Sequence, residues 1–252
     1  QRRARAGRRT SRGVAYSHRD ARMTPLLSVV IPVRNEAQAL PCLLDDLADL
    51  RAAGAELILV DGGSTDGTCE LALGRVDQLL RTAPGRALQM NAGAAVARGE
   101  YLWFVHADTR ISAESLRNLQ EALSERPLWG RFDVRLSGPG LALRLIGAMI
   151  SLRSRLSGIA SGDQGIFVTR QHFEALGGYA QIPLMEDLQL CRRLKSRARP
   201  RCLRPPLSTS SRRWEQHGIW RTVVLMWCLR LAYYCGASPV KLARQYRRGS
   251  LL

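Results

Sequence analysis

Three clusters of polar side chains each follow directly on an apolar run in the first half of the chain. They are Arg34-Asn35-Glu36, Asp61-Gly62-Gly63 and His106-Ala107-Asp108. Carboxylates can hold a divalent cation, which stabilises a phosphate leaving group as a Lewis acid. A fourth cluster, Glu186-Asp187, supplies a candidate base for an attacking hydroxyl. These are the residues from which we expect chemistry, provided that the fold brings them together.

The apolar runs before the first three clusters have the composition of strands buried on both faces. Residues 26–33 are continuous and rich in β-branched side chains, and residues 56–61 are a second such run. Strands that alternate with helices favour a mostly parallel sheet covered on both faces, with ligands at the carboxyl ends of the strands. The expected strands are residues 26–33, 56–61, 76–81 and 101–108, and the expected helices are residues 37–53, 86–98 and 112–125.

The second half of the chain is less regular. Residues 131–136 and 165–169 have strand composition, and helices are expected at residues 141–156, 185–197 and 219–235. The last of these helices is the most apolar and is rich in aromatic residues.

Four segments, in this order and spacing, resemble the family 2 glycosyltransferases. They are residues 28–36, 57–68, 85–108 and 176–190, and the resemblance spans about residues 26–215. It implies an α/β fold of the GT-A type, a Rossmann-like, mostly parallel sheet flanked by helices, with apolar or amphipathic helices at the C-terminus. It also implies a bacterial enzyme that transfers a sugar, with inversion, from a nucleotide-diphosphate sugar to an acceptor hydroxyl. The acceptor expected is a lipid or a membrane-proximal glycan.

The resemblance implies a nucleotide pocket at the ends of the first two strands. In the family, the acid at position 61 reads the nucleobase, and residues 32–36 form the other wall of the pocket. A cation at position 86 opens a helix, whose N-terminus suits a diphosphate. From the residues alone, Asp61 equally suits a turn cap and Glu36 a first-turn acid on a helix dipole. The implied donor-binding residues are Pro32, Arg34, Glu36, Asp61, Arg86 and Arg213.

His106-Ala107-Asp108 stands where the family has Asp-x-Asp. Asp108 matches the metal-binding acid, whereas His106 replaces the first acid and is open to three interpretations: metal ligation, ribose contact or packing. The resemblance thus implies a divalent metal cofactor, Mn²⁺ or Mg²⁺, and the departure at His106 puts strict metal dependence in question. An imidazole beside a carboxylate suits manganese better than an all-oxygen site would.

The resemblance also assigns the catalytic and acceptor side. Asp187 is implied as the base that takes the acceptor's proton, with Glu186 in support, although acids in a first helical turn also suit the helix dipole. Asp163 and Gln164 are implied to line the acceptor pocket, with a tight turn as the alternative. Trp214, in the Arg212-Arg213-Trp214 segment, is expected to stack on a sugar of the acceptor.

Charge divides the chain into parts. Residues 1–22 carry eight arginines and one acid, a net charge of +7 out of the formal +17 of the whole chain. This leader lacks an apolar stretch and is therefore no secretory signal. We expect residues 1–22 to be a disordered basic leader, or an extension that precedes a natural start at Met23. The glycosyltransferase domain is expected at residues 23–215, and C-terminal amphipathic helices at residues 216–252.

The helix expected at residues 219–235 is interrupted by Arg221 and Arg230, so it is too short in apolar length to span a membrane. Its aromatic residues and the basic tail after it are typical of an interfacial helix that meets anionic lipid. The alternative is a core or oligomer helix. We expect a peripheral protein at the cytoplasmic face of the cell membrane; the oligomeric state is left open. Six scattered cysteines without a Cys-x-x-Cys pair agree with a reducing cytoplasm.

Three other functions are alternatives to sugar transfer. A sugar nucleotidyltransferase shares the sheet, metal and nucleotide, but places a glycine-rich loop after the first strand, where residues 32–38 hold no glycine. A catalytically idle nucleotide-sugar-binding protein of the same fold is suggested by the altered His106-Ala107-Asp108 motif, although Asp108 and Asp187 are both present. A nucleic-acid binder rests on charge alone, with no recognition module, so no nucleic-acid partner is expected.

Overall fold

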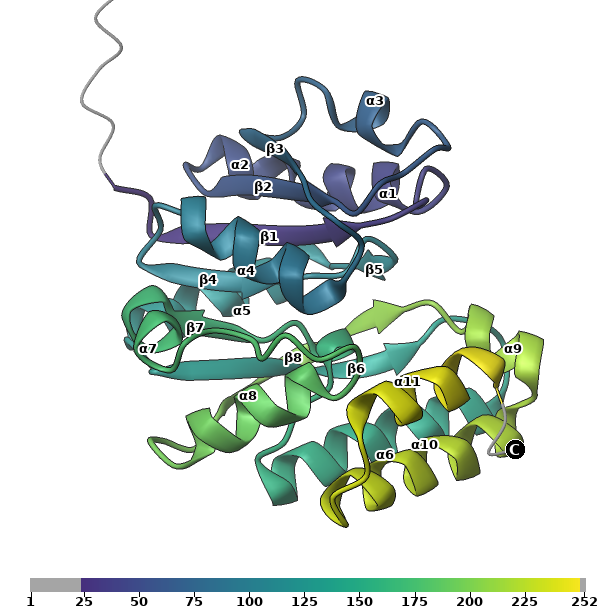
Figure 1. The fold of residues 1–252 in the computed structure, drawn as a ribbon. Coiled ribbons are helices and arrows are strands. Elements are labelled where there is room, and N and C mark those ends of the chain that lie inside the picture. Colours follow the sequence, from purple (N-terminus) through teal and green to yellow (C-terminus); the bar gives the residue numbers. More distant parts are fainter. Residues whose placement is uncertain (1–23, 250–252) are drawn as a thin grey trace, which may run out of the picture.

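The described residues, 24–249 of the computed structural model, form a sheet with the strand order β3-β2-β1-β4-β7-β6-β8-β5 (Figure 1). The first four strands of that order run parallel, and β7 is antiparallel to both of its neighbours. The mostly parallel α/β fold expected from the sequence is therefore confirmed. The strands are β1 Leu27–Val33, β2 Glu56–Asp61, β3 Gln78–Arg81, β4 Tyr101–Phe104, β5 Thr109–Arg110, β6 Trp129–Leu136, β7 Phe167–Thr169 and β8 Arg201–Thr209.

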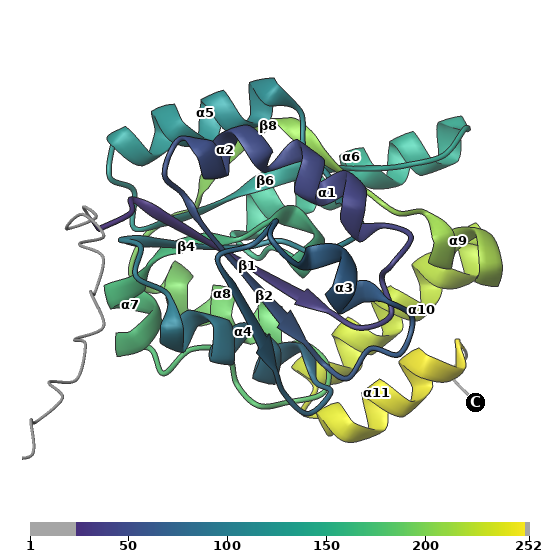
Figure 2. The same ribbon diagram turned by 90° about the horizontal axis from the view of Figure 1, so that it is seen from above.

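Helices cover both faces of the sheet. Figure 2 shows α1, α2 and α5 on one side and α4, α7 and α8 on the other, and each layer closes its own apolar core. The α10 and α11 helices pack on the same core as α8, through residues such as Leu225 and Leu242. The helices are α1 Leu40–Asp46, α2 Ala48–Ala52, α3 Thr68–Ala72, α4 Arg86–Val96, α5 Ala113–Ser124, α6 Leu141–Ser157, α7 Arg170–Ala175, α8 Glu186–Lys195, α9 Arg212–His217, α10 Ile219–Tyr234 and α11 Pro239–Arg248, with a 3₁₀ turn η1 at Gly162–Gln164.

Close approach of α4 to the sheet depends on a small residue. A Cβ atom on Gly93 would lie 2.5 Å from Cγ1 of Val30 in β1, a distance that real contacts do not reach. Gly93 is therefore a packing position, as expected. The closeness sets α4 directly against β1 and β2, with its N-terminus near the carboxyl ends of both strands (Figure 1).

Several boundaries differ from the sequence expectation. The helix expected at residues 37–53 is two helices, which meet at Leu47. The strand expected at residues 101–108 ends at Phe104, which leaves His106 and Asp108 in the loop that follows. The boundary expected at residue 215 falls inside α9, and the leader expected at residues 1–22 lies outside the described residues.

The strand β8 was not expected, because its Pro205-Pro206 pair has no N–H groups to donate to a ladder. It nevertheless pairs with β6, and the register between the two strands shifts between Phe132 and Val134. That irregularity lies where the prolines interrupt the regular pairing. The strand β8 leads directly to α9, which reaches the carboxyl-end edge of the sheet (Figure 1).

Candidate active site

The loops after β1 and β2 hold each other in place. The N–H of Asn35 donates to Oγ of Ser64 at 2.9 Å, and Oδ1 of Asn35 accepts from the N–H of Thr65 at 2.9 Å. The next N–H, of Glu36, donates to Oγ1 of Thr68 at 2.9 Å. The Ser-Thr-Asp-Gly-Thr sequence after β2 thus fixes the segment that carries Arg34 and Glu36. A cavity of about 390 Å³ opens beside this loop, lined by Glu36, Asp66 and Arg212 among others.

Asp61 ends β2 and caps the turn that follows. Its side chain is 2% exposed, and Oδ1 accepts from the N–H of Ser64 at 2.9 Å. Burial opposes ionisation, but the hydrogen bonds from Ser64 outweigh it and lower the pKa of Asp61, so the group is a carboxylate. The turn-cap interpretation of Asp61 is therefore confirmed, and a contact with a nucleobase stays a prediction. Pro32 lies one residue before the end of β1, and Arg34 is exposed just beyond it.

Gln89 of α4 is a positioning residue that sequence reasoning missed. Its Nε2 donates to the backbone oxygens of Val33 and Val60, each at 2.8 Å, and the side chain is buried. It therefore ties the ends of β1 and β2 together immediately below the two loops. Its only signal in the sequence is a polar residue on the apolar face of a helix.

His106 contacts the η1 turn. Its Nδ1 lies 3.3 Å from Oδ1 of Asp163, and a Cβ atom on Gly162 would lie 2.8 Å from Cε1 of the imidazole ring. Among the three interpretations of His106, the structure thus bears out packing, with an added pairing to Asp163. Burial would raise the pKa of Asp163, but its hydrogen bond with His106 and the charge of His106 lower it.

Asp108 lies among other acids. Burial raises the pKa of its carboxyl group, and the charge of Asp163 raises it further, while His106 and Arg212 oppose the rise. The pKa of Glu36 is raised by burial and then by Asp108. The three carboxyl groups of Glu36, Asp108 and Asp163 therefore share one electrostatic site.

These acids offer oxygen donors for a hard cation. Within residues 24–249, no three His, Cys, Asp or Glu side chains converge as a complete metal site. Magnesium commonly binds through one or two carboxylates, with substrate phosphates and water completing its coordination. Asp108, with Asp163 nearby, fits that incomplete kind of site, because both groups supply carboxylate oxygens. His106 fits less well, because its Nδ1 is paired with Asp163 and the edge of its ring packs against Gly162.

Arg212 of α9 lies at this site. Its Nη2 lies 3.4 Å from Oε2 of Glu36, and its charge lowers the pKa of both Glu36 and Asp108. The side chain of Arg213 lies outside the described residues, so its role in donor binding stays a prediction. Arg212 is a further candidate from the same segment, which was not expected from the sequence.

Two residues expected on the acceptor side make structural contacts. Trp214 packs against the apolar cluster of Leu136, Leu143 and Ile146 and so anchors α9. Gln164 is fully buried; its Oε1 accepts from the N–H of Ser161 at 3.1 Å and its Nε2 donates to the backbone oxygen of Phe132 at 3.1 Å. Gln164 thus shapes the turn that presents Asp163. Both polar groups of the Gln164 amide are used in these bonds, which gives Gln164 a structural role in place of the expected acceptor contact. Trp214 is only partly buried, and its acceptor contact stays a prediction.

Asp187 is the second residue of α8 and is bonded to the η1 turn. Its Oδ2 accepts from the N–H of Gly162 at 2.8 Å, and its Oδ1 accepts from the N–H of Leu188 at 2.7 Å. Met185, the residue just before α8, has the left-handed φ of 70°. Such a conformation is uncommon outside glycine and is concentrated at functional sites. Asp187 is therefore held in a defined direction beside the turn of Asp163.

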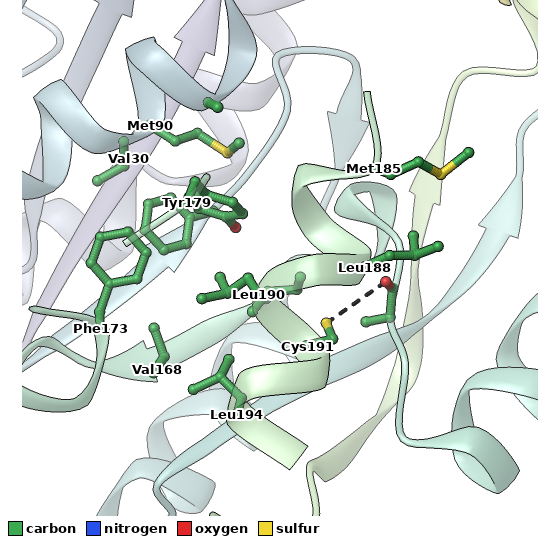
Figure 3. Packing of buried hydrophobic residues seen from close by; sticks show 14 of the residues in the cluster. Val30, Met90, Val168, Phe173, Tyr179, Met185, Leu188, Leu190, Cys191 and Leu194 are labelled. Carbon is green, nitrogen blue, oxygen red and sulfur yellow. Dashed lines mark hydrogen bonds between the residues drawn. The ribbon is translucent and has the colours of Figure 1, made fainter. Parts of the chain in front are cut away.

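The core beneath α8 fixes this arrangement. Figure 3 shows Leu188, Leu190, Cys191 and Leu194 pointing from α8 into the packed interior. The thiol of Cys191 donates to the backbone oxygen of Ala160 at 3.7 Å. The η1 turn is thus bonded to α8 at Gly162, and the segment before the turn is bonded to α8 at Ala160.

Arg86 links the two layers of the site. Its Nη1 lies 3.6 Å from Oε1 of Glu186, whose side chain is almost fully buried. Burial raises the pKa of Glu186, and the charge of Asp187 raises it further, whereas Arg86 opposes the rise. Arg86 itself is half-exposed, so its guanidinium is open to a further anion. A residue expected to bind the donor and a residue expected to support catalysis are therefore direct neighbours.

Comparison with known proteins identifies the family of the chain. Residues 28–174 match the model of the family described as glycosyl transferase family 2. A PGL/p-HBAD biosynthesis glycosyltransferase of Mycobacterium tuberculosis is 37% identical over 109 residues, which cover 40% of this chain and 43% of the relative. Glycosyltransferase GlyG of Streptococcus pneumoniae is 32% identical over 111 residues, which cover 41% of this chain and 37% of the relative. The matched part of the chain spans less than half the length of either relative.

Solved structures share the fold. Mannosyltransferase PcManGT from Pyrobaculum calidifontis, solved with GDP-Man and Mn²⁺, superposes with a TM-score of 0.62 at 21% identity, covering 88% of this chain and 68% of that one. S. aureus TarS 1-349 in complex with UDP superposes with a TM-score of 0.60 at 17% identity, covering 79% and 65%. At such low identity, these two likenesses establish the fold alone.

Proposed function

The chain belongs to glycosyl transferase family 2 and is a glycosyltransferase, and we propose that it uses a nucleoside-diphosphate sugar as donor and an acceptor hydroxyl, with inversion. The observation that carries the proposal is the bond between Asp187 and Gly162 at 2.8 Å. Through the η1 turn, this bond brings a candidate base beside Asp163 and His106, and hence to the acids at the end of β4.

The donor lies across the loops after β1 and β2. Glu36 and Asp61 are at the nucleoside end, and Arg86 and Arg212 are the cations available to the diphosphate. The helix α4 begins at Arg86, so its free N–H groups add to the attraction for phosphate. Structures of the same fold with UDP, or with GDP-Man and Mn²⁺, support a donor of this class.

Asp108 would hold a divalent cation, Mn²⁺ or Mg²⁺, with Asp163 as its nearest supporting acid. The cation would act as a Lewis acid that stabilises charge on the leaving diphosphate. His106 is then a positioning residue that orients Asp163, which agrees with their 3.3 Å separation.

The transfer itself is a single displacement. The acceptor oxygen forms a bond to the anomeric carbon while Asp187 takes the hydroxyl proton. The bond from that carbon to the diphosphate oxygen breaks, and its electron pair leaves with the nucleoside diphosphate. Because attack and departure are on opposite faces of the sugar, the configuration inverts. The N–H groups of Gly162 and Leu188 hold the Asp187 carboxylate during this step.

The acceptor side belongs at a membrane surface. Large apolar side chains are exposed along one side of α6 and along one side of α10, each opposite the buried side of its helix. No helix among residues 24–249 is long and apolar enough to cross a bilayer. Exposed apolar rows next to the basic helix α11 suit interfacial binding at the cytoplasmic face of the membrane. The exposed residues are Leu141, Leu145, Met149, Leu152 and Leu156 on α6, and Trp220, Val224, Trp227, Leu231 and Tyr234 on α10.

Product analysis tests the proposal. The full chain is incubated with Mn²⁺, bacterial lipid extract and a panel of labelled UDP-sugars and GDP-sugars. We expect label in the organic phase and one nucleoside diphosphate released per sugar transferred. Pyrophosphate as the product would instead identify a nucleotidyltransferase, and binding of a nucleotide sugar without turnover would identify an idle binding protein.

A further inference from the structure

Arg153 of α6 and Arg230 of α10 have buried nitrogen atoms without partners. The Nε and Nη2 atoms of Arg153 and the Nε atom of Arg230 are buried. None of these three donors has a hydrogen-bond acceptor in the described part of the chain. A buried donor without an acceptor costs free energy, and more so when it is charged. Neither arginine belongs to the candidate active site around Asp108 and Asp187.

Helical spacing places both arginines in the seam between α6 and α10. Ile146 and Ile150 of α6 pack in one apolar cluster with Ile219 and Val223 of α10. Arg153 follows three residues after Ile150, and Arg230 follows seven residues after Val223, so each continues the row on its own helix. The two helices meet through this shared apolar cluster. The seam between α6 and α10 is therefore apolar at the isoleucines and Val223, and positively charged at Arg153 and Arg230.

The two positive charges affect each other, and one of them affects the candidate base. Burial lowers the pKa of Arg153 to about 10, with repulsion from Arg230 as the next cause and attraction to Asp187 opposing it. The electrostatic range of Arg153 thus includes both Arg230 and Asp187.

A second arginine cluster beside α6 makes the contrast clear. Asp133 accepts from Arg155 at 2.8 Å and from Arg204 at 3.0 Å, and it also pairs with the buried Arg131. That cluster has its own anion, although Nε of Arg131 is also unpaired. Among the described residues no carboxylate is bonded to Arg153 or Arg230, so an anion from outside the described chain can complete their site.

We propose that Arg153 and Arg230 bind a phosphate group of the acceptor, and that the acceptor is a phosphate-bearing lipid. The inference rests on the proposed function and names its acceptor class. Two facts favour the acceptor over the donor. The charge of Arg153 interacts with that of Asp187, the candidate base, and neither arginine lies on the β1 or β2 loops. The same two helices expose the apolar rows, with Leu152 next to Arg153 and Leu231 next to Arg230, where a lipid chain can lie.

Binding measurements on the full chain test this site. The probes are farnesyl phosphate, farnesol as its neutral match, inorganic phosphate, and UDP and GDP with Mn²⁺. The variants are Arg153→Gln and Arg230→Gln, with Arg221→Gln, an exposed position on α10, as the matched control. We expect farnesyl phosphate to bind more tightly than either farnesol or inorganic phosphate. Each seam variant should weaken farnesyl phosphate by about tenfold or more, as for a lost charge-assisted hydrogen bond.

The same variants have a stability signature that a purely structural arginine does not give. Because each substitution relieves repulsion between two like charges, the ligand-free variants should melt at the same temperature as the wild type or higher. A variant that melts lower while also losing the probe would mark a structural arginine and overturn the proposal. Binding of the nucleoside diphosphates should be unchanged in all three variants.

Other outcomes distinguish a failure of the phosphate site from a failure of the proposed function. Equal binding of farnesyl phosphate and farnesol, or unchanged farnesyl phosphate binding in both seam variants, would overturn the anion site. Equal binding of farnesyl phosphate and inorganic phosphate would remove the lipid from it. Loss of UDP and GDP binding in the seam variants would assign both arginines to the donor. Failure of the wild type to bind any nucleoside diphosphate would count against the proposed function instead.

Discussion

The Nδ1 atom of His106 lies 3.3 Å from Oδ1 of Asp163, although the two residues are far apart in the sequence. His106 occupies the position where the family has its first acid of Asp-x-Asp, and its imidazole is paired with an acid delivered by the η1 turn. A carboxylate is thus returned to the neighbourhood of Asp108 from the second half of the chain. We infer that Asp163 compensates for the histidine, so the altered motif is compatible with metal-dependent transfer.

Metal dependence follows from this pairing. A nucleoside diphosphate should stabilise the protein clearly with Mn²⁺ and only weakly after chelation. A ligand present at about 100 times its Kd adds about 2.7 kcal/mol to the free energy of unfolding. Thermal denaturation with UDP and GDP, with and without Mn²⁺, measures the difference. Asp108→Asn should lose the metal-dependent part; if that variant keeps it in full, Asp108 is not the ligand.

Arg212 should contribute to donor binding. It is half-exposed, pairs with Glu36, and faces the cavity beside the β1 loop. Loss of one charge-assisted interaction, about 1.5–3 kcal/mol, should raise the Kd of the nucleotide sugar by about tenfold or more in Arg212→Gln. The matched control is Arg201→Gln, since Arg201 is similarly exposed and pairs with Glu125 elsewhere on the sheet. Equal affinity in the two variants would exclude Arg212 from the donor site.

The arginines of α9 show where prediction from the sequence stops. The alternation of apolar strands and helices was sufficient to predict the parallel half of the sheet and the edge at which the polar loops meet. The side of a short helix that faces a site depends on its angle of entry, which here is set by the unexpected strand β8 and by Trp214 packing under α9. Adjacent arginines in a six-residue helix cannot be told apart without that packing.

Other residues were missed for a different reason. Gln164 resembles a ligand-binding residue by type, yet its amide is used up by two backbone groups in the interior. Arg230 was noticed only as a charge that interrupts an apolar helix, and Arg153 lies within the helix expected at residues 141–156. Their relation to each other depends on the packing of α6 against α10, which no local pattern encodes. Tertiary contacts therefore decide the role of each of these polar residues.

Stability should depend on pH through Glu186. The folded-state pKa of this group is raised by burial and by Asp187, so the folded protein binds the proton more tightly than the unfolded chain does. The contribution of Glu186 to stability is thus fully present below its ordinary pKa and is lost as the pH rises through the raised value. Glu186→Gln has no such proton. Its free energy of unfolding, relative to wild type, should increase with pH in urea titrations; a difference that does not change with pH would contradict this.

Membrane binding should depend on the apolar rows of α6 and α10. Leu152→Glu and Trp227→Glu each place a charge in a row that we expect to meet lipid. Burial of a large apolar side chain contributes about 1.5–3 kcal/mol, so each variant should bind anionic vesicles about tenfold less well or worse. Leu73→Glu is the control, because Leu73 is equally exposed but lies after α3. Sedimentation with vesicles measures the three; a loss of the same size in Leu73→Glu would remove the rows as the docking surface.

The leader should be dispensable. A chain that starts at Met23 should match the full chain in melting temperature and in turnover, because it keeps all of β1 and also the backbone oxygens of Pro25 and Leu26, which accept from the N–H groups of Glu100 and Tyr101. The measurements are thermal denaturation and sugar transfer on both chains. A large drop in either quantity would make the arginine-rich segment part of the enzyme.

The base can be separated from its neighbour by two conservative substitutions. Asp187→Asn removes the proton acceptor but keeps a side-chain oxygen that can bond the N–H of Gly162, so the η1 turn should stay in place. Transfer should fall by about 10²- to 10⁴-fold, with the Kd of the donor nearly unchanged. Glu186→Gln should cost less, because that group is almost fully buried against Arg86 and acts only in support. If both acids merely served the helix dipole, each variant would lose about 0.3–1 kcal/mol of stability and neither would lose transfer specifically. Transfer rate and donor affinity, measured at equal folded fraction, decide between the two patterns. Retained turnover in Asp187→Asn would remove the residue from the catalytic step, and the single-displacement mechanism would then lack its base.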